Sequence, residues 1–119
     1  MAFASPKPKQ ISVPYNGKIA DITETNTGKH TLTLANAGGT GAIAGETRKI
    51  VAIQTYANRM TGSGVFLVYS NEGSSFIANI WSYSIAIVFI ADGTQRLQYS
   101  LDTANDDFDL YCMGYVVEV

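Results

Sequence analysis

DLYCMGYVVEV, residues 109–119, is the stretch that decides the fold. Side chains alternate between the two faces of a strand. Strict alternation gives one face of Tyr111, Met113, Tyr115, Val117 and Val119, and another of Leu110, Cys112, Gly114 and Val116. Both sets are apolar, and a strand that is apolar on both faces must be covered on both faces. The stretch therefore predicts a strand with a neighbour over each face.

Two more stretches repeat this property. Val65–Tyr69 and Ile85–Ile90 are also apolar at both parities, whereas His30–Leu34 alternates as a strand with one solvated face does. A two-sheet sandwich has one interior, and no helical periodicity of useful length offers a cover for an outer face. We therefore expect another copy or another protein to supply the cover. The alternative is that the outward apolar residues are merely scattered, which is common.

Turn signals divide the chain at short intervals, including Asn16-Gly17, Gly38-Gly39 and Asp92-Gly93. The runs between the turns predict strands at 11–13, 18–23, 30–34, 49–56, 65–70, 76–80, 84–91, 96–101 and 110–119. Short strands spaced by turns predict an all-β fold, an antiparallel β-sandwich of about eight strands with little or no helix. We expect one domain at 11–119, behind an extended N-terminal arm at 1–10.

Composition narrows the function classes. Charged residues make up only 15% of the 119 residues, against about 25% in typical soluble domains. The net charge of −2 argues against a general nucleic-acid binder. Residues 1–59 carry seven Lys and Arg against three Asp and Glu, and residues 60–119 carry one against seven. The opposite charges of the two halves could pair within the fold, pair between copies, or remain separately solvated.

Targeting signals are not evident. The start MAFASPKPKQ lacks the pattern of a signal peptide, and the longest apolar run, about 85–91, is too short for a membrane helix. We expect a protein made in the cytoplasm, without membrane contact. In the arm, Pro6 and Pro8 favour extended geometry, and Phe3 is a potential anchor on a neighbouring molecule. The alternative is a frayed terminus.

Catalytic and cofactor motifs are weak, so we expect no enzyme and no cofactor. His30 is the only histidine and Cys112 the only cysteine, which excludes an intramolecular disulfide and argues against a zinc cluster. The loop Gly39–Gly45 lacks the context of a nucleotide-binding turn and predicts a surface loop. The acidic stretch 102–109 suits a solvated turn better than a calcium loop. Trp81 and Tyr83 beside Asn79 would suit a sugar if exposed, although core packing or an interface is the more common role.

The segment GETRKIVAIQTYAN at 45–58, the Gly-rich loops, the short Pro-containing arm and the Gly114-Tyr115 pair in the last predicted strand resemble jelly-roll proteins of tailed-phage virions. This resemblance implies a jelly-roll-like sandwich and one of two functions. The first is a capsid decoration or cement protein, usually a homotrimer that binds the major capsid protein. The second is a receptor-binding knob at a fibre tip. With only about ten residues ahead of the first predicted strand, we expect the first.

The arm and the last predicted strand are the expected contact regions. Phe3, Pro6 and Pro8 would contact the phage head or another virion protein, and Tyr111, Tyr115 and Val117 would face the axis of a trimer. The protein would be located in the virion and would stabilise the head by binding it. A lectin-like domain that binds a glycan is the remaining alternative.

Overall fold

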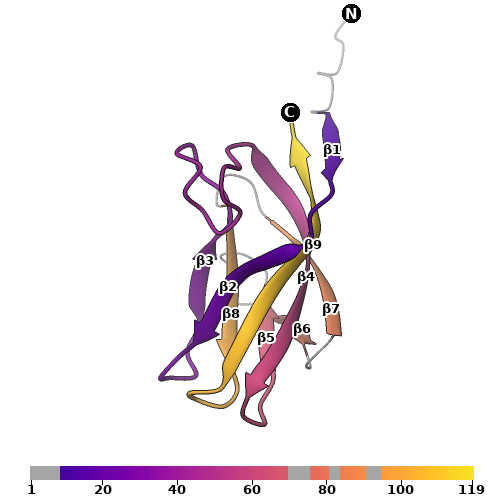
Figure 1. The fold of residues 1–119 in the computed structure, drawn as a ribbon. Helices are drawn as coiled ribbons and strands as arrows, with labels where there is room; N and C mark the ends of the chain where they lie inside the picture. The colour runs from indigo at the N-terminus through magenta and orange to yellow at the C-terminus, as the bar shows by residue number, and fades with distance from the viewer. Residues whose placement is uncertain (1–8, 70–75, 81–83, 91–94) are drawn as a thin grey trace, which may run out of the picture.

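The computed structural model describes residues 9–69, 76–80, 84–90 and 95–119, and within these ranges it consists of strands and loops without a helix (Figure 1). The strands are β1 (Gln10–Val13), β2 (Gly17–Thr23), β3 (His30–Thr33), β4 (Lys49–Thr61), β5 (Phe66–Tyr69), β6 (Phe76–Ile80), β7 (Ser84–Phe89), β8 (Arg96–Leu101) and β9 (Asp107–Glu118). The predicted all-β class is confirmed. The largest differences are in β4 and β9, which extend farther than predicted because their polar ends pair with each other.

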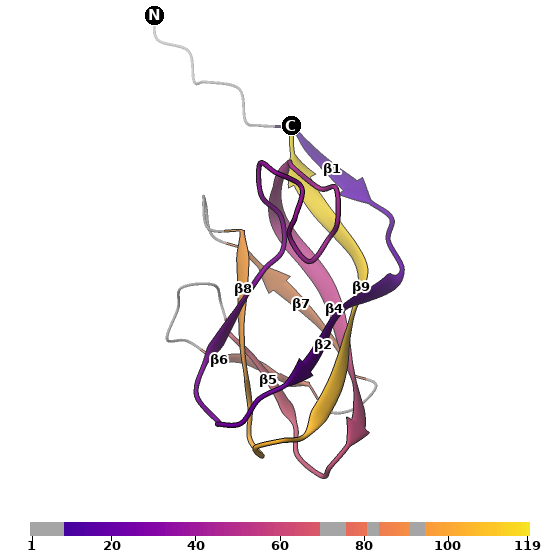
Figure 2. The ribbon, with the colours of Figure 1, turned by 60° about the vertical axis from the view of Figure 1, so that its left-hand side comes forward.

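The strands form two antiparallel sheets that face each other as a sandwich (Figure 2). Sheet A has the order β1-β9-β4-β7, and β2 also pairs with β9. Sheet B has the order β3-β8-β5-β6. The pairs β5·β6, β4·β7, β3·β8 and β2·β9 are nested and alternate between the sheets. The chain therefore pairs like one long hairpin that is folded over itself.

Aromatic rings join the two sheets at the centre of the core. Phe66 of sheet B stacks on Tyr99 with 5.3 Å between ring centroids, and it lies 5.6 Å from the ring of Phe108 in sheet A. Phe66 and Phe108 are fully buried. Each such side chain stabilises the fold by about 2–3 kcal/mol relative to an exposed one. This contact fixes the spacing of the sheets, and with it the position of the outer faces.

The Gly-rich loop between β3 and β4 is partly buried. Leu34 and Ile43 are both buried, and the Ile43 amide donates to the Leu34 carbonyl at 2.9 Å. A Cβ atom on Gly41 would lie 2.5 Å from that same carbonyl oxygen, so only glycine permits the approach. The prediction of a surface loop is therefore wrong for this part of it, because Ile43 closes one end of the core.

Strand β1 starts at Gln10, one residue before the predicted domain boundary. Gln10 lies opposite Glu118 of β9, and the Val119 amide donates to the Lys9 carbonyl at 2.9 Å. The C-terminus therefore lies beside the start of β1 (Figure 1). Residues 1–8 precede this point and lie outside the described residues.

Candidate interaction surface

Strand β9 reverses the direction of its side chains at Met113. Cys112 pairs with Thr55 of β4 and Gly114 pairs with Gln54, so Met113 is an extra residue in the ladder, a β-bulge. Gly114 has a φ of 142°, which residues with a side chain rarely adopt. The glycine therefore permits the bulge.

The bulge changes which residues of β9 enter the core. Phe108 and Leu110 are buried before it, and Tyr115 and Val117 are buried after it, with exposed fractions of 7% and 0%. The prediction that Tyr115 and Val117 face a trimer axis is therefore wrong for these two residues. Its assumption of strict alternation does not hold across an inserted residue.

Tyr111 is the predicted β9 contact that lies on the outer face of sheet A. It is opposite Tyr56 of β4, and the two rings stack with 4.8 Å between centroids and 15° between planes. Both side chains are half-buried. Tyr111 therefore belongs to a flat aromatic pair on the surface, and its contact with a partner stays a prediction.

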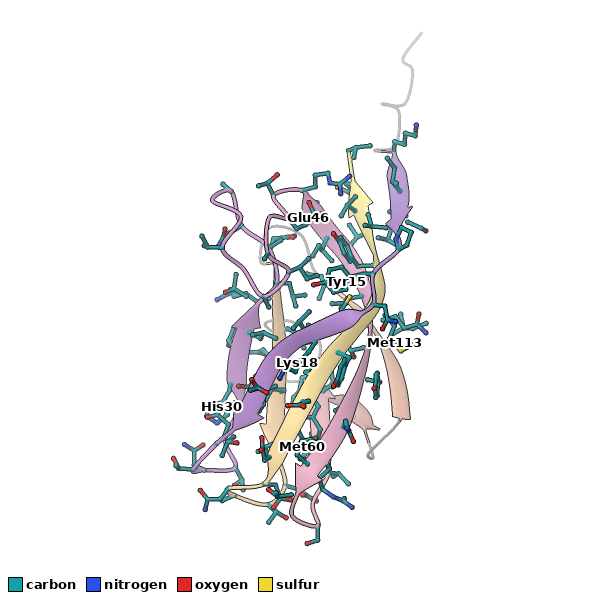
Figure 3. The ribbon with its side chains drawn as sticks, in the orientation of Figure 1. Tyr15, Lys18, His30, Glu46, Met60 and Met113 are labelled. Atoms are coloured by element: carbon teal, nitrogen blue, oxygen red, sulfur yellow. The ribbon has the colours of Figure 1, made fainter. Side chains whose placement is uncertain are left out.

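Next to this pair the outer face of sheet A is apolar. Met113 is 38% exposed and Ile87 is 57% exposed, and Ala52 of β4 lies opposite Val116 of β9 in the same part of the sheet. Figure 3 places Met113 on the opposite side of β9 from the inward Tyr15. A shallow groove of about 380 Å³ crosses the strands here, lined by residues 12–14, 52–54, 87 and 113–116. We call it the outer-face groove.

Charged pairs border the apolar part of this face. The Lys49 ammonium lies 3.0 Å from Glu118, and the Lys18 ammonium lies 2.9 Å from Asp21 and 3.9 Å from Asp109. The hydrogen bond from Lys18 lowers the pKa of Asp21. Lys49–Glu118 and Lys18–Asp109 each join the basic half of the sequence to the acidic half. Part of the charge asymmetry is therefore neutralised within one chain.

On the outer face of sheet B the described side chains, Leu67 aside, are mostly polar. Thr31 and Gln98 lie opposite each other on it, and the Tyr69 hydroxyl is 2.9 Å from the Ser100 hydroxyl. The Lys29 ammonium lies 4.5 Å from the centroid of the Tyr69 ring. In the part of the chain that the structure describes, the apolar groove thus belongs to sheet A.

A buried carboxylate, Glu46, lies in the loop before β4. Glu46 is 6% exposed and accepts two hydrogen bonds from the Arg48 guanidinium, at 2.8 and 3.0 Å, and one from the Tyr115 hydroxyl at 2.6 Å. The Arg48 hydrogen bonds lower the pKa of Glu46 to about 2. Burial, followed by the bond to Glu46, raises the pKa of Tyr115 to about 12. This cluster anchors the loop before β4 to β9.

The acidic stretch 102–109 is used to close loops. Asp102 accepts the Val65 amide at 2.8 Å, and the buried Asp106 accepts the Gly64 amide at 2.6 Å. No group of three metal-ligating side chains is found among the residues that the structure describes. These two carboxylates therefore join the β4–β5 loop to the β8–β9 loop.

His30 and Cys112 have different surroundings. The His30 Nδ1 lies 3.3 Å from Glu24, to which the Tyr99 hydroxyl donates at 2.9 Å. Burial raises the pKa of Tyr99 and also that of the Cys112 thiol. The Cys112 sulfur lies 3.6 Å from the Gly114 carbonyl. Each of the two residues thus has its own partners, on different sheets.

Several predicted contact residues lie outside the described residues. These are Phe3, Pro6 and Pro8 of the arm and the aromatic residues Trp81 and Tyr83. Their roles as interface or sugar contacts stay predictions. The outer-face groove itself was not predicted, because its lining comes from four strands and depends on the bulge.

Comparisons with known proteins give no match. No protein-family model matches the chain, no curated protein matches it, and no solved structure matches it. Across the described ranges, no helix has the length and apolar character needed to cross a membrane.

Proposed function

We propose that this chain is a structural virion protein that assembles with copies of itself and decorates a phage head. The observation that carries the proposal is the apolar outer face of sheet A, with Ile87 and Met113 exposed in one groove. Specific interfaces have an apolar centre and a polar rim. The groove and its charged borders on sheet A have this arrangement.

The energetics favour a partner over this face. Ile87 and Met113 are more than one-third exposed, and burial of the part that is still exposed would stabilise an assembly by about 0.5–1.5 kcal/mol for each side chain. The stacked Tyr56 and Tyr111 rings extend the same surface. Aromatic residues and methionine are enriched at the centres of interfaces. This agrees with the sequence argument that three strands carry more apolar surface than one sandwich hides.

The strand pairing supports the choice of a virion role. Nested antiparallel pairs that alternate between two sheets would suit the jelly roll that we propose, a fold used by viral capsid and lectin domains. The resemblance to phage virion proteins selects the capsid class, with a trimer as the expected oligomer. Such a protein would stabilise the head by mass action, because it binds the assembled head and not its separate subunits.

The test uses purified heads of the phage whose genome encodes the chain, before and after incubation with the protein. The proposal predicts saturable co-sedimentation and heads that survive a higher temperature. Ile87→Lys should reduce both effects, because it places a charge in the groove, whereas Thr31→Lys on the outer face of sheet B should not. The proposal is wrong if the protein does not sediment with heads, and binding to host cells or to a glycan array would indicate an adsorption role instead.

A further inference from the structure

We propose that the outer-face groove of one copy receives residues 1–5 of a neighbouring copy, with Phe3 as the side chain that enters it. The inference rests on the proposed self-assembly and names the segment that makes the contact. In this proposal the arm binds a second copy of the chain, whereas the sequence had predicted that it contacts the phage head.

The groove has the chemistry that a short apolar segment requires. Ile87, Met113, Val116 and Ala52 provide its apolar surface, and Gln54 provides a side-chain amide beside them. The segment MAFAS has one large aromatic residue among small ones and carries no charged side chain. Aromatic side chains in apolar pockets are the usual anchors of protein interfaces.

The direction of β1 determines where the arm leaves the domain. Gln10 lies opposite Glu118 and Val13 lies opposite Tyr115, so the chain runs along β1 toward the groove, which β1 borders at Ser12–Pro14. The arm precedes Lys9 and therefore departs from the end of β1 that is farther from the groove. Its eight residues span at most about 29 Å when extended.

This geometry favours the groove of a neighbour over the groove of the same copy. To return to its own groove, the arm would need to reverse next to Pro8. Proline fixes its own φ and keeps the preceding residue extended, so Pro6 and Pro8 stiffen the segment where that reversal is required. The two prolines therefore disfavour a return to the same copy, and we propose the groove of a neighbour.

The contact joins two different surfaces, the arm of one copy and the groove of the next. Such a heterologous contact propagates around a ring and closes when the rotation permits, as in a cyclic trimer. The arrangement therefore accounts for a trimer without contacts of Tyr115 or Val117 between copies, and both residues are buried in their own chain.

A mixture of two complementary variants tests the contact between arm and groove. One variant lacks residues 2–8 and keeps the groove, and the other, Ile87→Lys, keeps the arm and has a charged groove. Each should be folded by circular dichroism and monomeric by light scattering. Their mixture should form a one-to-one complex that grows no further, because it contains one intact arm and one intact groove.

Phe3→Ala should weaken assembly about 30-fold or more, as loss of an interface anchor does. Ser5→Ala is its control.

The outcomes separate the two proposals. If the wild-type protein is a monomer at all concentrations, the proposed self-assembly fails, and this inference fails with it. If the wild-type protein and the deletion variant are both oligomers of equal stability, only the arm contact is overturned, and a face-to-face contact of two grooves replaces it. Two monomeric variants that do not combine also overturn the inference.

Discussion

Replacement of Gly114 by alanine tests the bulge that turns the outer part of β9. Gly114 has a φ of 142°, and the nearest atom to an added Cβ would be the Val13 carbonyl oxygen at 3.6 Å, which is ordinary contact. The cost of Gly114→Ala is therefore backbone strain without a steric clash. Strain of this kind costs about 1–3 kcal/mol. For a domain of this size the melting temperature should fall by roughly 4–12 °C.

The assay is urea denaturation at one fixed protein concentration, with the free energy of unfolding extrapolated to zero urea and an unchanged m-value. Gly38→Ala is the matched control, because Gly38 has no positive φ and the nearest atom to its added Cβ lies at 3.6 Å. The control should remain within about 0.5 kcal/mol of the wild type. A Gly114→Ala variant that is equally stable would refute the bulge, and with it the burial of Tyr115 in the core.

Three further predictions concern other parts of the sandwich. The pKa of Glu46 is lowered to about 2. Ionised Glu46 should therefore stabilise the folded state by on the order of 3 kcal/mol above pH 4.5, and this stabilisation should be lost as the pH falls toward 2. Glu46→Gln should flatten this part of the pH–stability curve. Cys112 is fully buried and its pKa is raised, so a thiol reagent should label it only on unfolding, and rapid labelling of the folded protein would contradict its position. A double-mutant cycle of Tyr56→Ala and Tyr111→Ala should give a coupling of about 0.5–1.5 kcal/mol, and additive losses would show that the stack contributes no stability.

The strands could be predicted because their signals are local. Asn-Gly and Gly-Gly turns and runs of β-branched residues depend on neighbours in sequence, and these located each of the nine strands, although the end of β4 was predicted five residues too early. The two-sided apolar character of residues 110–119 also correctly identified a strand that carries apolar groups on an outer face. Met113 on that face remains partly exposed in the single chain.

The assignment of β9 side chains to inner and outer faces was wrong beyond Met113, although the sequence contains a signal for the bulge. An isolated glycine inside a strand pattern indicates a bulge, and Gly114 was read as an ordinary strand position. The Glu46 cluster had no such signal, because Tyr115 lies 69 residues away and only the fold brings the two together. The outer-face groove also had no local sequence signal, since Ser12, Ile87 and Met113 come from distant segments.

Light scattering of the wild-type protein across a dilution series tests the central claim most directly. One chain has a mass of 12.8 kDa, and the account predicts a defined multiple of it, three being the expected number, that falls to one chain on dilution. Ile87→Lys should move this dissociation to higher concentration, whereas Thr31→Lys should leave it in place. A mass of 12.8 kDa at every concentration would contradict the claim that the outer face of sheet A is covered by another copy.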